Sequence, residues 1–88
     1  MLEYHAAYFK QPSGWYVVEL LDFPGVLSQG KTLKSARGMI RDALKLMAEC
    51  YAEKGKPLPR PNPKATAKKA DYLEPVRLSF RAQKAASG

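Results

Sequence analysis

The sequence predicts a single α+β domain: an antiparallel three-stranded meander, one long helix packed on the sheet and a fourth C-terminal strand, in the order β-β-β-α-β. Three observations carry this prediction. The chain has 88 residues, the length of one domain. Residues 2–29 contain segments that alternate as strands do, and residues 33–54 repeat apolar side chains with the period of a helix. We therefore place the domain at 1–80 and a flexible tail at 81–88.

Residues 2–9 and 15–21 have the pattern of two strands in a hairpin. Tyrosine and phenylalanine favour extended structure in the first, and residues 10–14 between them include the proline and glycine that turns use. In the second strand, alternation separates a wholly apolar set from a mixed one. We expect the core face of the hairpin to carry Tyr4, Ala6, Tyr8, Tyr16, Val18 and Leu20.

A tight reversal is predicted at 22–25, Asp-Phe-Pro-Gly. Proline removes a backbone donor there, and glycine accepts a positive φ. A short third strand follows at 26–29 and ends at Gly30. Thr32 has the side chain of a helix N-cap, so we expect a helix to begin directly after it.

Residues 33–54 form the clearest element of the sequence. Their apolar side chains recur at spacings of three, four, seven and eleven, which places them on one face of a helix. Gly55 supplies the left-handed residue that ends helices, and a proline follows shortly afterwards. The expected buried face is Leu33, Ala36, Ile40, Ala43, Leu44, Met47 and Tyr51.

The segment after the helix is a connector rather than a folded element. Residues 56–63 contain four prolines in eight positions, which favours a stiff, extended chain. Residues 64–71 are polar and are predicted to form a loop. Residues 72–80 alternate as a half-buried strand, in which Pro75 is restricted to the start or to a sheet edge.

The composition indicates an anionic partner. Lys and Arg number 15 against 8 Asp and Glu, a net charge of +7. Such a charge most often indicates a nucleic-acid partner and sometimes a membrane surface or an acidic protein. One cysteine excludes an internal disulfide, and the N-terminus lacks the pattern of a signal peptide, so a cytoplasmic location is expected. No apolar run is long enough for a membrane span, and no membrane partner is expected.

The side chains that carry chemistry are few. His5 and Cys50 occur once each, and no motif marks the orienting group or the oxyanion site that a nucleophile needs. The carboxylates lack the spacing of metal ligands. We therefore expect no enzyme activity, catalytic residue, metal or cofactor.

A basic stripe follows one side of the predicted helix. Its members step by three, four and four residues, so they share one helix face. One interpretation is a solvated face. The alternative is a module that binds nucleic acid through phosphate contacts of this stripe and of the cations towards the C-terminus, Lys64, Lys68, Lys69, Arg77, Arg81 and Lys84. The stripe consists of Lys34, Arg37, Arg41 and Lys45.

Five short motifs, taken in order, resemble the N-terminal domain of HicB-like antitoxins. They are Gly-Trp-Tyr-Val-Val at 14–18, Asp-Phe-Pro-Gly-Val at 22–26, Gln-Gly at 29–30, Thr-Leu at 32–33 and Gly-Lys-Pro-Leu-Pro at 55–59. The resemblance implies that 1–80 is one HicB-like domain with a fold like a truncated RNase H and without nuclease activity. It departs from the family in its charge, because acidity would suit the usual basic partner.

The same resemblance implies a function. HicB-like antitoxins, or stand-alone relatives, bind and mask a small partner toxin, an mRNA-cleaving ribonuclease, and they form dimers or higher oligomers. Many members add a DNA-binding domain, but too few residues follow the last predicted strand here, so we expect none. The residues that the resemblance marks, as partner contacts or as structural elements, are Trp15, Tyr16, Asp22, Phe23, Pro24 and Gly25.

Overall fold

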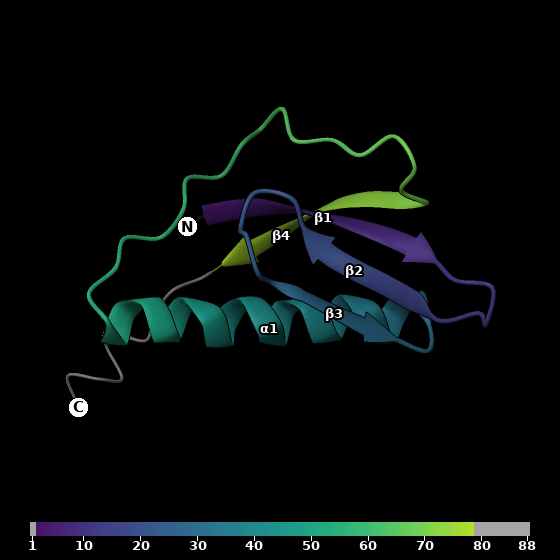
Figure 1. Cartoon of the computed structure of the whole chain (residues 1–88), viewed down its shortest axis with the longest axis horizontal. Coiled ribbons are helices and arrows are strands. Elements are labelled where there is room, and N and C mark those ends of the chain that lie inside the picture. Colours follow the sequence, from purple (N-terminus) through teal and green to yellow (C-terminus); the bar gives the residue numbers. More distant parts are fainter. Residues whose placement is uncertain (1, 79–88) are drawn as a thin grey trace.

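The structure, a computed structural model, describes residues 2–78 and shows one helix packed on an antiparallel sheet (Figure 1). The sheet has the strand order β3-β2-β1-β4. The predicted α+β class, with a meander, a long helix and a fourth strand beside the first, is confirmed. The predicted tail at 81–88 and the last two residues of the predicted final strand lie outside the described residues. The elements are β1 (Leu2–Lys10), β2 (Tyr16–Leu20), β3 (Leu27–Gly30), α1 (Leu33–Glu53) and β4 (Tyr72–Leu78).

The hydrophobic core lies between α1 and one face of the sheet. The register places Tyr8 beside Val18 on β2 and beside Tyr72 on β4, so these side chains share the helix-facing side. Of the six predicted core residues of the hairpin, five are buried, and Tyr16 packs half-buried at the margin. The β4 residues Val76 and Leu78 complete this face.

The helix begins and ends where its local sequence predicts. Thr32 is the N-cap: its hydroxyl accepts a hydrogen bond from the Ser35 amide at 3.0 Å, and the Ser35 hydroxyl accepts one from the Thr32 amide at 3.0 Å. At the other end Gly55 takes φ +68°, the left-handed conformation expected there. The buried stripe is confirmed in outline and also includes Ala48, which the predicted face omitted.

Two glycines next to the core have opposite environments. A Cβ built on Gly30, at the end of β3, would lie 2.5 Å from the backbone nitrogen of Ala36. Only glycine therefore lets β3 approach the start of α1 so closely. A Cβ on Gly38 would meet one guanidinium nitrogen of Arg41 at 3.9 Å, an ordinary contact.

We expect Gly38→Ala to raise the free energy of unfolding by about 0.5–1 kcal/mol, because alanine restricts the unfolded chain and favours the helix. Urea denaturation followed by circular dichroism measures this change. Gly30→Ala is the matched control and should lower the stability, since its methyl group clashes with the backbone of α1. A loss of stability in Gly38→Ala would contradict the open position of this glycine.

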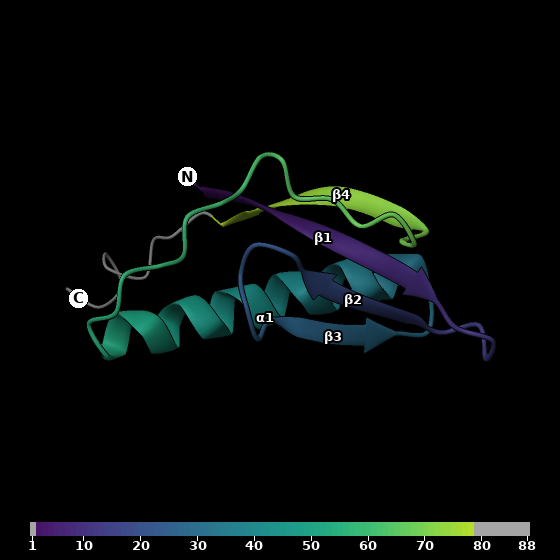
Figure 2. The ribbon, with the colours of Figure 1, turned by 45° about the horizontal axis from the view of Figure 1, so that its top comes forward.

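The proline-rich connector (56–63) joins the helix to the far side of the sheet. Figures 1 and 2 show it leaving the end of α1, passing the start of β1 and continuing towards β4 on the side of the sheet away from the helix. Ala7 is fully buried although the register places it on this far face. Part of the far face is therefore covered within the domain itself.

Candidate functional site

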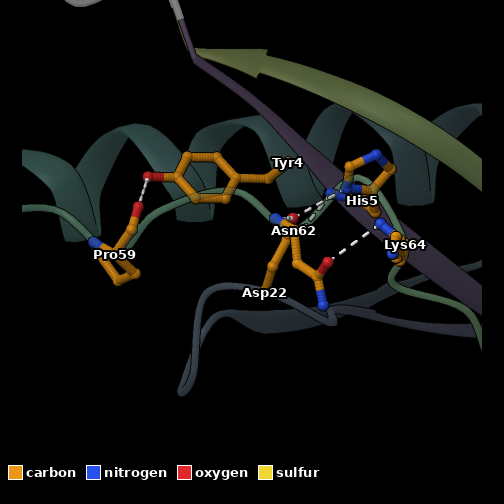
Figure 3. Close-up of polar contacts among 6 residues, drawn as sticks. All are labelled: Tyr4, His5, Asp22, Pro59, Asn62 and Lys64. Atoms are coloured by element: carbon orange, nitrogen blue, oxygen red, sulfur yellow. Dashed lines mark hydrogen bonds and ion pairs between the residues drawn. The ribbon is translucent and has the colours of Figure 1, made fainter.

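The Asp-Phe-Pro-Gly turn after β2 contains a buried carboxylate, Asp22, with hydrogen-bond partners from two other segments of the chain. The Asp22 side chain is 3% exposed. Its Oδ1 accepts a hydrogen bond from the His5 amide at 2.9 Å, and its Oδ2 lies 2.8 Å from His5 Nδ1 and accepts a 2.8 Å bond from the Asn62 amide (Figure 3). One carboxylate thus joins β1, the β2–β3 turn and the connector. We call Asp22, His5 and Asn62 the Asp22 clasp.

The Asp22 clasp holds its carboxyl in the ionised form. Burial by itself raises the pKa of the Asp22 carboxyl, but the hydrogen bonds from His5 and Asn62 outweigh burial and lower this pKa below its ordinary value. A second bond fixes the connector nearby, where the Tyr4 hydroxyl donates to the Pro59 carbonyl at 2.7 Å (Figure 3). The site is therefore a structural tie between distant segments of the chain.

The other three residues of the turn divide between core and surface. Phe23 is fully buried, with its ring centroid 5.2 Å from the ring of Tyr4 and 5.2 Å from that of Tyr51. Gly25 takes φ +88°, and Gly25 and Pro24 are exposed. Asp22 and Phe23 thus serve the interior, and Pro24 and Gly25 form the accessible part of the motif.

Trp15 and Tyr16 lie at the opposite end of β2 from this turn. The Trp15 side chain is partly exposed, and the Lys31 ammonium lies 5.8 Å from its ring centroid. The Tyr16 ring is half-buried, 6.3 Å from the ring of Tyr72. The length of β2 separates the two ends by about 15 Å. The six residues that the resemblance marks therefore do not form one patch.

The basic stripe is divided by an ion pair. The Arg37 guanidinium donates to both carboxylate oxygens of Glu74 on β4, at 2.9 and 2.6 Å. This fork lowers the pKa of Glu74, although partial burial acts in the opposite direction. The side chains of Lys34, Arg41 and Lys45 are exposed and make no ion pair with any other residue between 2 and 78.

Comparison with known proteins decides the family. The family model described as "HicB_like antitoxin of bacterial toxin-antitoxin system" matches residues 4–80. This chain belongs to the HicB-like antitoxin family. Antitoxin HicB of Escherichia coli (strain K12) is 32% identical over 62 residues, which are 70% of this chain and 45% of that protein. The HicB-like chain thus spans less than half the length of this curated relative.

Two solved structures share the HicB-like fold. The N-terminal domain of Burkholderia pseudomallei antitoxin HicB gives a TM-score of 0.76 at 24% identity, over 90% of this chain and 100% of that one. A chain of the HicA3 and HicB3 toxin-antitoxin complex gives 0.65 at 24% identity, over 86% and 96%. At these identities the likeness shows the fold, and it supports the fold prediction independently of the motifs.

The side chains that could carry chemistry in the described part of this HicB-like domain either lie apart from one another or are already held by hydrogen bonds. Within residues 2–78, no three His, Cys, Asp or Glu side chains come together as metal ligands. His5 is held in the Asp22 clasp, and Cys50 is half-buried on α1. No helix in the same range combines the length and apolarity that crossing a bilayer requires.

Sequence reasoning missed three partners in the HicB-like domain. It gave Asp22 only as a turn residue that serves as a partner contact or a structural element, whereas His5 and Asn62 bind its carboxylate. It also left Glu74 without a role, whereas Glu74 binds Arg37. No local signal singled out Asn62, because Leu58 and Arg60 in the same stretch also carry a backbone amide between two prolines.

Proposed function

We propose that this chain is an antitoxin that binds and masks a small toxin, with an mRNA-cleaving ribonuclease as the expected partner and the cytoplasm as the place of action. The observation that carries the proposal is the family match over residues 4–80. The fold shared with a chain of the HicA3 and HicB3 toxin-antitoxin complex supports it. Masking requires only a surface of fixed shape, so it needs no catalytic group on this chain.

The arrangement of the turn supports masking by a rigid surface. The Asp22 clasp and the buried Phe23 ring fix the backbone on either side of Pro24 and Gly25. A surface that is ordered before binding loses less conformational entropy when a partner docks. We assign partner contact to Pro24 and Gly25 and assign support of their position to Asp22 and Phe23.

Co-expression tests the proposal. The small protein encoded beside this chain should arrest growth when it is produced alone, and growth should resume when the chain is produced with it. The two proteins should also co-purify as a complex through size-exclusion chromatography. Growth arrest that the chain does not relieve, with both proteins soluble and no complex formed, would overturn the antitoxin assignment.

The second candidate is a nucleic-acid-binding module built on the basic stripe. The exposed cations Lys34, Arg41 and Lys45 favour it, because phosphate contacts need accessible charge. Arg37 is bound to Glu74 and would have to leave that pair. A comparison of an oligonucleotide with an acidic peptide, described below, distinguishes the two kinds of ligand.

A further inference from the structure

The outer edge of β4 carries backbone groups that face away from the sheet. The His5 amide and carbonyl point towards the β2 side, where they bond Asp22 and Leu21. Backbone groups alternate along a strand, so those of Tyr4 and Ala6 point towards β4. The register then directs the backbone groups of Leu73 and Arg77 outwards, together with the carbonyl of Pro75.

Pro75 lies at the middle of this edge strand, in agreement with the second of the two positions that the sequence allowed it, the strand start or a sheet edge. Its ring nitrogen replaces the central outward donor. A neighbouring strand can still bond Leu73 on one side of Pro75 and Arg77 on the other. The edge therefore lacks a backbone donor at Pro75 but still offers the outward backbone groups of Leu73 and Arg77 to a neighbouring strand.

A groove runs between this edge and α1. It has a volume of about 340 Å³, and its lining includes Tyr8, Arg37, Arg41, Glu74 and Val76. Arg37 is held by Glu74 from within the domain. Arg41 is exposed and makes no ion pair with residues 2–78. The groove therefore offers one available guanidinium next to an open strand edge.

The charges around the edge are unbalanced. Three carboxylates near the edge already have partners inside the domain: Glu3 binds Arg77, Glu74 binds Arg37, and Asp71 accepts from the Lys10 amide. Arg41 lines the groove and has no ion-pair partner among the described residues, and Asp42, which follows it on α1, is exposed and has none either. A ligand at this edge meets positive charge that only an acidic group can complement.

We propose that the β4 edge and the adjoining groove dock an extended acidic segment of a partner protein, which joins the sheet as a further strand. Its backbone bonds Leu73 and Arg77, and an acidic side chain on its helix-facing side reaches Arg41. This site is separate from the Asp-Phe-Pro-Gly turn, so it goes beyond toxin masking and does not depend on it.

The charges select this occupant over two others. A second copy pairing β4 with β4 would bring the Arg41 guanidinium of each helix towards the same edge, and like charges repel. A nucleic acid would use the cations but leave the outward amides of Leu73 and Arg77 unused. An acidic strand satisfies both the backbone groups and the cations.

Amide NMR of the full chain tests the site. The probe is a short synthetic peptide that alternates valine and glutamate, compared with its valine–glutamine counterpart and with a single-stranded oligonucleotide. We expect the glutamate peptide to shift the Leu73 and Arg77 amides and to leave the Leu27 and Gln29 amides of the other edge strand, β3, unchanged. The glutamine peptide should bind roughly tenfold more weakly.

Arg41→Glu should weaken the binding of the glutamate peptide by roughly tenfold or more. The control Lys64→Glu, at an exposed lysine directly after the connector, should change the affinity for this peptide by less than about twofold. The melting temperature of each variant checks that it is folded. The proposal is overturned if millimolar glutamate peptide leaves the Leu73 and Arg77 amides unshifted, or shifts the β3 edge instead. It is equally overturned if the oligonucleotide binds more tightly than the peptide, or if the free chain is a dimer joined through β4.

Discussion

Phe23→Ala is expected to lower the free energy of unfolding by about 3–5 kcal/mol, because it empties a fully buried aromatic position. The ring packs between Tyr4 of β1 and Tyr51 of α1, so its loss leaves a cavity that joins the sheet and the helix. Domains of this size have a total stability of about 5–15 kcal/mol. Urea denaturation followed by circular dichroism should therefore show a variant that is close to unfolding in buffer.

Two further variants serve as controls for Phe23→Ala. Phe9→Ala removes the same ring from a half-buried position on the far face of the sheet and should cost much less. Phe23→Leu keeps most of the volume and should fall between the wild type and Phe23→Ala. If Phe23→Ala retained nearly full stability, Phe23 would not be a core residue, and the turn would be free to use it as a partner contact.

Asp22→Asn is expected to lower the free energy of unfolding by about 2–3 kcal/mol. The two carboxylate oxygens of Asp22 accept hydrogen bonds from the backbone amides of His5 and Asn62, and asparagine replaces one of these oxygens with an NH₂ group. The asparagine NH₂ would face at least one donor, and a buried amide would lose its partner. Asp42→Asn, at an exposed position on α1, is the control and should be nearly neutral.

The same pair of variants has a distinct dependence on pH. The pKa of Asp22 is lower in the folded protein than the value of about 3.9 expected in the unfolded chain. Its contribution to stability is therefore complete above that value and is lost as pH falls through the lower folded pKa. Wild type and Asp42→Asn should lose stability on acidification below about pH 4 more steeply than Asp22→Asn. If wild type, Asp42→Asn and Asp22→Asn all lost stability equally steeply on acidification, the role of the Asp22 clasp would be contradicted.

Local patterns predicted the elements of this fold well, since each depends on neighbours in the chain. The stripe on α1 follows from the 3.6-residue period, and its start follows from Thr32, whose cap involves a residue only three positions away. The hairpin core follows from simple alternation. The predicted face omitted Ala48, which is fully buried, because alanine carries little hydrophobic signal.

The interactions that define the candidate sites were beyond such patterns. His5, Asp22 and Asn62 meet across separations of 17 and 40 residues, and Arg37 meets Glu74 across 37. Their contacts depend on the strand order and on the path of the connector, neither of which is local. The basic stripe shows the consequence: as a pattern it has four equivalent cations, but the fold pairs Arg37 with Glu74 and places Arg41 in the groove beside β4, while Lys34 and Lys45 are exposed on α1.

The fold shows where part of the net charge of +7 lies on the surface. Glu3 and Glu74 near β4 are paired inside the domain, whereas Arg41 is exposed in the groove beside the strand edge, with Lys34 and Lys45 exposed on the same helix. Under the proposed docking of an acidic segment, this charge would serve a surface distinct from the Asp-Phe-Pro-Gly turn.

The central claim is that this chain silences a ribonuclease by covering it. The most direct measurement is RNA cleavage by the purified protein of the neighbouring gene while the chain is titrated in. The account predicts that cleavage falls to the background rate at stoichiometric amounts of the chain. An undiminished cleavage rate in large molar excess of folded chain would contradict it.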